Sequence, residues 1–239
     1  MRVIITKNYE ELGKVASQHL LGTMFASQER VNLAITAGRT PLEVYKYLVP
    51  EVKDKNYLNH VHYYNFDEIP YKDNKQEGIT IADLRRLYLN PANVLEENIH
   101  VLDGENYENQ DNRIQNDGGL DSILLGVGAD GHYCGNLPNT TTVNDYTSKV
   151  TFEDNPDLEQ VIIDHFIDPK DAPDFYVTMG PRSIMSAKQL VLIANGREKS
   201  GIMKSFIEGE ITPDLPVTYL KLHPNLVVIM DEEAASELN

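Results

Sequence analysis

The stretch SILLGVGADGHYCGNLP, residues 122–138, decides the fold more than any other part of the chain. It begins with a short apolar run of the type that forms a buried strand, and it continues into a glycine-rich turn. This turn holds an Asp, a His, the one Cys of the chain and an Asn within seven residues. In open α/β sheets, ligands bind just beyond the carboxyl ends of the strands. The stretch therefore predicts a strand that carries reactive side chains to a binding site.

Similar short runs recur along the chain and alternate with stretches of helical periodicity. The spacing of apolar residues predicts helices at 9–26, 41–48, 80–89 and 196–209. Runs rich in β-branched residues predict strands at 2–6, 31–36, 61–66, 98–102, 122–128, 175–179, 189–195 and 225–230. This alternation is typical of an α/β fold with a mostly parallel sheet flanked by helices. The segment 147–174 shows no clear period and is expected to be an irregular excursion.

The composition narrows the classes of function. A chain of 239 residues with 41% hydrophobic content can bury a substantial core, and we expect a single domain spanning 1–239. A net charge of −16 without a long Lys/Arg cluster excludes nucleic acid and anionic membranes as expected partners. The chain shows no signal-peptide pattern and no apolar run of membrane length, and its single Cys fits a reducing compartment. We therefore expect a cytoplasmic protein with a small-molecule partner.

The turn ITAGRTP, which follows the predicted strand 31–36, has the features of an anion site. Gly38 allows a tight turn, Thr40 can cap the next helix, and Pro41 suits the first helical position. Backbone N–H groups, the Thr hydroxyl and the helix dipole would converge there on an anion. An ordinary capped helix explains the same residues, so the turn alone leaves both interpretations open.

A second turn, NGREK at 195–199, joins another predicted strand to a helix. Arg197 and Lys199 lie in the first helical turn, where cations oppose the helix dipole. A bound phosphate would remove this conflict, although both side chains could also extend into water. Two such turns in one acidic chain favour a phosphorylated ligand. The chain lacks the G-x-G-x-x-G and G-K-[ST] patterns, which excludes a dinucleotide or NTP site.

Two further places carry acidic or basic groups suited to proton transfer. Asp67 and Glu68 follow an aromatic strand, and a carboxylate in a partly apolar setting can act as a base, although acidic pairs also end strands or cap helices. Asp130 and His132 are spaced so that the carboxylate can hold one ring nitrogen while the other faces a ligand. A structural His in a glycine-rich turn is the alternative. A nucleophilic Cys134 activated by His132 is disfavoured, because close neighbours in sequence rarely have the required geometry and a small buried Cys is the usual case. A zinc site is disfavoured because it would need further ligands from distant residues without recognisable spacing.

The chain resembles the glucosamine-6-phosphate deaminase/isomerase family, with 6-phosphogluconolactonase as a near relative, in five motifs that occur in the family's order: ITAGRTP, NFDEIPY, GVGADGHYCGNLP, NGREK and YLKLHPNLVVIMDEEA. The resemblance covers nearly the whole chain. It implies a modified doubly wound, Rossmann-like α/β fold of the NagB/RpiA/CoA-transferase-like kind. It also implies a phosphosugar substrate, no organic cofactor and no metal, and it is compatible with a homo-oligomer.

The resemblance also implies roles for particular residues. Asp67 matches the base that moves a proton between C-2 and C-1 of the sugar, His132 matches the acid/base that opens the ring, and Asp130 matches the carboxylate that orients it. Imidazole suits ring opening because it both accepts and donates a proton near neutral pH. The expected substrate and phosphate contacts are Gly38, Arg39, Thr40, Glu68, Gly131 and Lys199.

Within the family, an apolar residue after the acidic pair and the motif LKLHP resemble a deaminase rather than a lactonase. Three departures from the deaminase pattern bear on the reaction. Leu137 stands where the motif has a second carboxylate, Arg39 stands where it has Gly, and no Arg in 151–172 matches the phosphate-binding Arg, for which Arg39 or Arg182 could compensate. We expect an isomerase/deaminase acting on an amino-hexose 6-phosphate. The alternatives are a 6-phosphogluconolactonase-type hydrolase and a non-catalytic phosphosugar-binding regulator.

Overall fold

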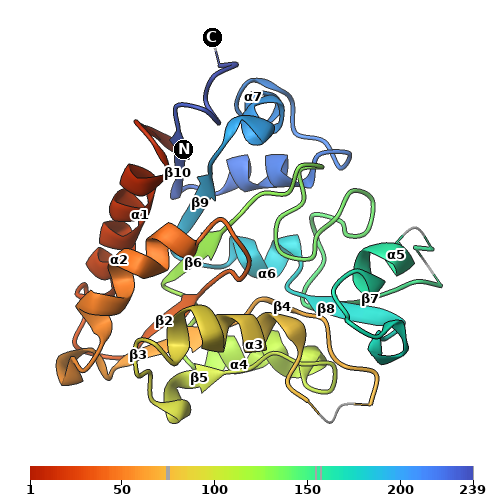
Figure 1. Ribbon diagram of the computed structural model, residues 1–239, viewed down its shortest axis with the longest axis horizontal. Coiled ribbons are helices and arrows are strands. Elements are labelled where there is room, and N and C mark those ends of the chain that lie inside the picture. Colours follow the sequence, from red (N-terminus) through yellow and green to blue (C-terminus); the bar gives the residue numbers. More distant parts are fainter. Residues whose placement is uncertain (74–75, 154, 157, 239) are drawn as a thin grey trace.

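The computed structural model describes residues 1–73, 76–153, 155–156 and 158–238 (Figure 1). In this part of the chain, a sheet of parallel strands runs through the molecule in the order β1-β10-β9-β6-β2-β3-β5. The strands are β1 (Arg2–Thr6), β2 (Val31–Ala34), β3 (Val61–Tyr64), β5 (Ile99–His100), β6 (Ser122–Leu125), β9 (Leu190–Ala194) and β10 (Leu226–Asp231). Each coincides with a run that the sequence predicts, and the prediction of a mostly parallel sheet is confirmed.

Helices cover both faces of this sheet (Figure 1). One face is covered by α1 (Tyr9–Met24), α2 (Leu42–Val52) and α3 (Ile79–Leu84), which continues into a π-helical segment (Arg85–Leu89). The other face is covered by α4 (Gln110–Asn116), α6 (Pro181–Met185) and α7 (Ser200–Glu208). Short 3₁₀ turns occur at Asn56–Leu58, Glu96–Asn98, Tyr107–Asn109, Pro169–Asp171, Arg197–Lys199 and Pro216–Leu222. None of the described helices is both long and apolar enough to cross a membrane.

Strand β9 shows why the parallel strands are apolar on both sides. Its side chains alternate between two cores, with Val191 and Ile193 packed under α1 and α2, and Leu192 and Ala194 packed on the opposite face. All four side chains are at most 1% exposed, so the strand reads as a continuous apolar run rather than as an alternating one. The same two-sided burial explains why β6 appears in the sequence as the uninterrupted run SILL.

A second, antiparallel sheet lies beside the first and is made of β4 (Asp67–Glu68), β8 (Phe175–Thr178) and β7 (Ser148–Thr151). The strand predicted at 175–179 is present as β8, but it lies in this antiparallel sheet rather than in the parallel one. The segment 147–174 is not irregular throughout, because it contains β7 and the helix α5 (Leu158–Ile163). These elements bury a third apolar cluster, built around Val150, Leu158, Ile162 and Tyr176.

Candidate active site

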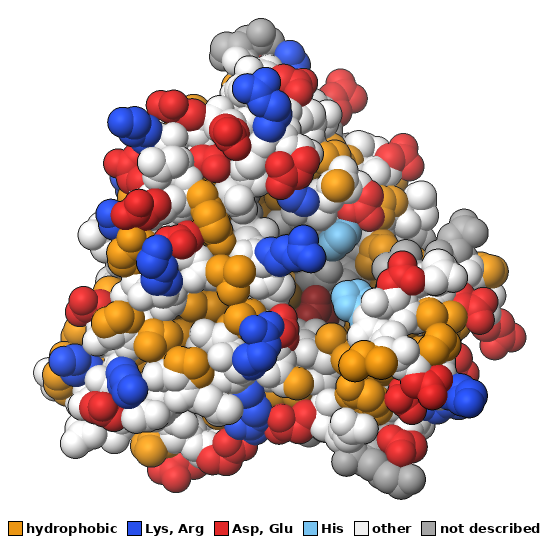
Figure 2. Space-filling view, viewed as in Figure 1, with side chains coloured by type: hydrophobic (Ala, Val, Ile, Leu, Met, Phe, Trp, Pro, Cys, Tyr) orange, Lys and Arg blue, Asp and Glu red, His pale blue; other side chains and the backbone are white. Residues whose placement is uncertain are grey.

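A cavity of about 490 Å³ opens at the carboxyl ends of the neighbouring strands β9, β6, β2 and β3. Figure 2 shows the surface hollowed there, with Lys, Arg and His side chains around the hollow. The segments that follow all four strands contribute to its lining, as the general rule for open α/β sheets requires. Of the predicted site residues, the lining includes Gly38, Arg39, Thr40, Asp67, Glu68, His132 and Lys199.

The turn after β6 holds the side chains of Asp130 and His132 together. The Asp130 Oδ1 atom lies 2.6 Å from His132 Nδ1 and also accepts a hydrogen bond from the His132 backbone N–H at 3.1 Å. The imidazole is 39% exposed and lines the cavity, so its other nitrogen is within reach of a ligand. Burial raises the pKa of Asp130, but the bonds from His132 outweigh burial and hold this pKa at about 2. The carboxylate is therefore ionised and fixes the ring.

Two glycines make this turn possible. A Cβ atom on Gly128 would lie 2.2 Å from the His132 ring and 2.6 Å from Asp130 Oδ1, so only glycine leaves room for the pair. Gly131 has a φ of +83° and lies against Leu215, and its carbonyl accepts the N–H of Val217. Gly131 is outside the cavity lining, so it shapes the turn rather than touching the cavity as the sequence analysis expected.

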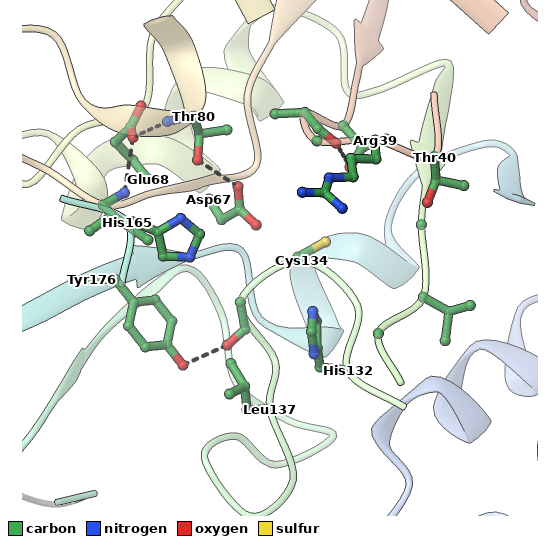
Figure 3. A pocket seen from close by; sticks show the side chains of 18 of the residues that line it. Arg39, Thr40, Asp67, Glu68, Thr80, His132, Cys134, Leu137, His165 and Tyr176 are labelled. Carbon is green, nitrogen blue, oxygen red and sulfur yellow. Dashed lines mark hydrogen bonds between the residues drawn. The ribbon is translucent and has the colours of Figure 1, made fainter. Parts of the chain in front are cut away.

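Asp67 stands on β4, opposite Thr178 of β8, rather than at the end of β3 itself. Its side chain points into the cavity (Figure 3), where the Thr80 hydroxyl donates a hydrogen bond to Oδ1 at 3.3 Å. Burial raises the pKa of Asp67 to about 6, although the Thr80 bond and the charge of His132 act in the opposite direction. A carboxylate with this pKa is mostly ionised at neutral pH and remains basic enough to accept a proton.

Glu68 is placed differently from its neighbour. Its carboxylate accepts backbone N–H bonds from Ile69, Thr80 and Ile81 at 2.7–2.9 Å, and it thereby caps the start of α3. Burial raises the pKa of Glu68 to about 8, against the effect of these N–H donors. Figure 3 shows the carboxylate directed at these donors. Both oxygens are engaged in this cap, and Glu68 also lines the cavity, so its expected contact with the substrate stays a prediction.

One end of the cavity is cationic and polar. It is lined by Arg39 and Thr40 after β2 and by Lys199 after β9. The prediction that Thr40 caps α2 is wrong, because the helix begins at Leu42 without a side-chain cap. The Tyr9 hydroxyl caps the helix instead, because it accepts a hydrogen bond from the backbone N–H of Glu43, in the first turn of α2, at 3.2 Å.

The remaining cations of the sequence analysis lie elsewhere. Arg197 precedes Lys199 in the same 3₁₀ turn but is exposed and outside the cavity lining. Arg182 lies over the ring of Tyr146 at 4.7 Å and is also outside the lining. Of the two candidates to compensate for the missing Arg, only Arg39 therefore reaches the cavity.

The opposite end of the cavity was not predicted. Its surface, which we call the apolar wall, consists of Ile69, Leu137, Leu158, Ile162 and Tyr176, all of which belong to the third apolar cluster. The His165 ring lines the cavity on the same side as Tyr176 (Figure 3). The i, i+4 spacing of Leu158 and Ile162 is the one signal in the sequence that could have indicated this helical wall.

Cys134 lines the cavity with a backbone φ of +50°, yet burial raises the pKa of its thiol well above the usual range. A thiol in this state is a poor nucleophile. Within the described ranges, no group of three or more His, Cys, Asp or Glu side chains is arranged to hold a metal ion. The arrangement is suited to acid/base chemistry on an anionic ligand, with Asp67 and His132 as the exchanging groups.

The chain is similar over its whole length to known proteins. The family model described as glucosamine-6-phosphate isomerases/6-phosphogluconolactonase matches residues 10–228. A glucosamine-6-phosphate deaminase of Clostridium perfringens is 33% identical, with 100% of each chain covered. One of Thermoanaerobacter pseudethanolicus is 32% identical, with 99% of this chain and 94% of the relative covered.

Two solved structures share the fold. A monomeric glucosamine-6-phosphate deaminase, described as a missing link of the NagB superfamily, has a TM-score of 0.83 at 24% identity and covers 99% of both chains. A 6-phosphogluconolactonase from Trypanosoma cruzi has a TM-score of 0.75 at 19% identity, with 100% of this chain and 97% of the other covered. The expected NagB-like, doubly wound α/β fold is thereby confirmed.

Proposed function

This chain belongs to the family of glucosamine-6-phosphate isomerases and 6-phosphogluconolactonases, and from that premise we propose that it is an isomerase/deaminase of amino-hexose 6-phosphates. One observation carries the proposal: Asp67 and the Asp130-held His132 face the same cavity, next to a cationic end that suits a phosphate. Ring opening requires a group that both accepts and donates a proton, such as the His132 imidazole, and isomerisation requires a base such as the Asp67 carboxylate.

The phosphate is bound at the cationic end. The Lys199 ammonium and the Arg39 guanidinium supply charge-assisted hydrogen bonds to its oxygens, and the Thr40 hydroxyl supplies a neutral donor. The overall charge of −16 makes this local concentration of donors the more significant, because the rest of the surface repels a phosphate.

His132 opens the sugar ring. Its free nitrogen takes the proton of the anomeric hydroxyl and returns a proton to the ring oxygen, which yields the C-1 aldehyde. The ionised Asp130 supports this exchange, because it holds the ring orientation and stabilises the imidazolium that forms in between.

Asp67 then takes the proton from C-2 and delivers it to C-1. The C-1 oxygen becomes a hydroxyl, the bond between C-2 and nitrogen becomes an iminium, and water hydrolyses the iminium to a ketose 6-phosphate and ammonia. A sugar phosphate with a hydroxyl at C-2 would stop at isomerisation. The pKa of about 6 suits Asp67 for both halves of this transfer.

One observation favours a second candidate, a lactonase. Leu137 stands where the deaminase motif carries a second carboxylate, so His132 has a carboxylate partner on one side only. A singly supported His suffices to activate water against a lactone carbonyl. In that reaction Asp67 would have no proton to move between carbons.

The test is a panel of 6-phosphates: glucosamine, galactosamine, glucose and gluconolactone. NMR would follow ketose formation, ammonia release and lactone opening separately. We expect ketose and ammonia in equal amounts from an amino-hexose 6-phosphate. Lactone opening alone would establish the second candidate, and binding without turnover of any member would establish a phosphosugar-binding regulator.

A further inference from the structure

The apolar wall presents side-chain carbons rather than free polar groups to the cavity. Leu137 and Ile69 are half-buried at the cavity, and Leu158 and Ile162 pack behind them. Tyr176 donates its hydroxyl hydrogen bond to the Gly135 carbonyl at 2.7 Å, so its polar atom is already engaged and its ring carbons remain for the wall. A sugar hydroxyl placed here would lose its bonds to water without replacement, which is unfavourable. The wall is therefore matched to an apolar group of the ligand.

The order of groups along the cavity shows which part of the ligand reaches the wall. Figure 3 shows Thr40 and Arg39 on one side, Asp67 and His132 nearer the middle, and Leu137 and Tyr176 of the apolar wall on the other side. A phosphate at the cationic end places the far end of the hexose, C-1 and C-2, beside the acid/base pair. A substituent on that end would extend directly onto the wall.

The chemistry of the proposed reaction limits where this substituent can be attached. The anomeric hydroxyl must be free, because ring opening takes its proton, and C-2 must keep its hydrogen, because Asp67 removes it. The C-2 nitrogen is the position that remains. It must be an amine rather than an amide, because its lone pair forms the iminium. The His165 ring, on the same side of the cavity, offers the amine N–H an acceptor.

Building on the proposed function, we infer that the preferred substrates are hexose 6-phosphates whose C-2 amine carries an apolar alkyl group lying on the apolar wall. Asp67 takes the C-2 proton while the C-1 oxygen gains one, so that an enol with an amino group at C-2 forms. C-1 is then protonated as the nitrogen lone pair forms an iminium. Water adds to C-2, the carbon–nitrogen bond breaks, and a primary amine leaves. The net reaction consumes one water and yields a ketohexose 6-phosphate and the amine.

The test uses glucosamine 6-phosphate and its N-methyl, N-ethyl and N-propyl derivatives with the full-length enzyme. Burial of each added methylene on the apolar wall strengthens binding by about fourfold. The value of kcat/KM is therefore expected to rise by about that factor for each step of the series. Ketose 6-phosphate and free alkylamine are both measured. A Leu137→Asn variant, which puts a polar amide of similar size in the wall, is expected to lower the preference for N-propyl over unsubstituted substrate by about tenfold or more.

The matched control is Leu222→Asn, because Leu222 is 55% exposed and lies outside the cavity lining. It is expected to keep the wild-type preference. If glucosamine 6-phosphate is converted but each added methylene lowers kcat/KM, the inference is overturned and the proposed function stands. If Leu137→Asn keeps the full preference, the wall is not the subsite and the inference is overturned as well. Absence of turnover with every member overturns both.

Discussion

The two ends of the cavity come from different parts of the fold and differ in what they contribute. The cationic end and His132 stand on loops that follow parallel strands, with Arg39 after β2, His132 after β6 and Lys199 after β9. Asp67, the other half of the acid/base pair, stands on β4 of the antiparallel sheet. Most of the apolar wall comes from the antiparallel layer and α5, with Tyr176 on β8 and Leu158 on α5, and Leu137 completes it from the loop after β6. The parallel sheet thus positions the cationic groups and His132, and the smaller antiparallel layer supplies Asp67 and most of the apolar surface.

The difference between the ends also separates two kinds of substitution. Changes at the polar end should alter turnover or phosphate affinity for every substrate, whereas changes in the wall should alter the choice between substrates.

The largest effect is expected from Gly128→Ala. The added Cβ would lie 2.2 Å from the His132 ring, so the ring must leave its place on Asp130. Loss of an aligned acid/base group costs about 10²–10⁴-fold in kcat/KM. The comparison variant is Gly126→Ala, since nothing lies within 4 Å of a Cβ at Gly126. Steady-state kinetics on both should show Gly128→Ala at least tenfold weaker than Gly126→Ala; equal losses would mean that the position of the ring does not limit turnover.

A smaller loss is expected from Lys199→Ala. The ammonium lines the cationic end, and removal of one charge-assisted bond to phosphate should raise KM by about 10- to 100-fold, with folding unaffected by circular dichroism. Arg197→Ala is the control, because Arg197 is a cation of the same turn outside the lining. If both variants raise KM equally, the effect arises from the positive electrostatic potential of the turn rather than from a direct contact between Lys199 and the phosphate.

The pH dependence of kcat/KM should follow Asp67. Its pKa of about 6 means that the carboxylate is ionised in about one molecule in eleven at pH 5 and in about ten of eleven at pH 7. The base must be ionised, so kcat/KM is expected to rise about tenfold between these values. A rate profile with no rise through pH 6 would assign the proton transfer to another group.

The smallest effect is expected from Leu137→Glu. This change places a carboxylate at the wall position where the deaminase motif carries its second carboxylate. Leu137 lines the cavity and is half-buried, so the new group can face His132 and support its imidazolium. We expect a gain of about threefold to tenfold on glucosamine 6-phosphate and a loss on N-propyl substrates. Ammonia release and thermal melting are measured on one preparation. A folded variant without gain would mean that the missing carboxylate does not limit deamination.

Much of the parallel sheet could be predicted because its strands carry a strong local signal. Runs such as 122–125 and 190–194 are buried on both sides, and their short length, with turn residues such as Gly126 and Gly196 close behind, distinguishes them from buried helices. The order of the strands could not be predicted from the same signal. Strand β8 is likewise a short run of aromatic and β-branched residues, yet it pairs antiparallel with β4 and β7, because pairing depends on partners distant in the chain.

The parts of the site formed by residues close together in the sequence could be predicted, and the parts formed by residues far apart in the sequence could not. Asp130 and His132 are two residues apart, so their hydrogen bond could be expected from spacing alone. The capping role of Glu68 could not be assigned from the sequence, because its partners Thr80 and Ile81 follow more than ten residues later. The apolar wall was missed for the same reason, because it forms only when α5 packs against β8.

The central claim is that Asp67 moves the C-2 proton of the substrate, and its direct test requires a variant that folds. Burial raises the pKa of Asp67 from 3.8 to about 6, so the folded state holds this proton more tightly than the unfolded state. The stability contributed by this group therefore falls as pH rises from about 4 to about 6 and stays lost at pH 7. The Asn side chain of Asp67→Asn does not ionise, so the variant does not lose this stability at pH 7. Its melting temperature there should be at least that of the wild type.

The measurement is exchange of the C-2 hydrogen of glucosamine 6-phosphate in deuterated water, followed by NMR with wild type and Asp67→Asn at saturating substrate. The amide keeps the shape of the side chain but cannot accept the proton. We expect exchange with the wild type, and with Asp67→Asn we expect exchange to fall by at least about 10²-fold while the substrate Kd stays within a few-fold. Exchange at the wild-type rate in the folded variant would contradict the assignment of Asp67 as the base.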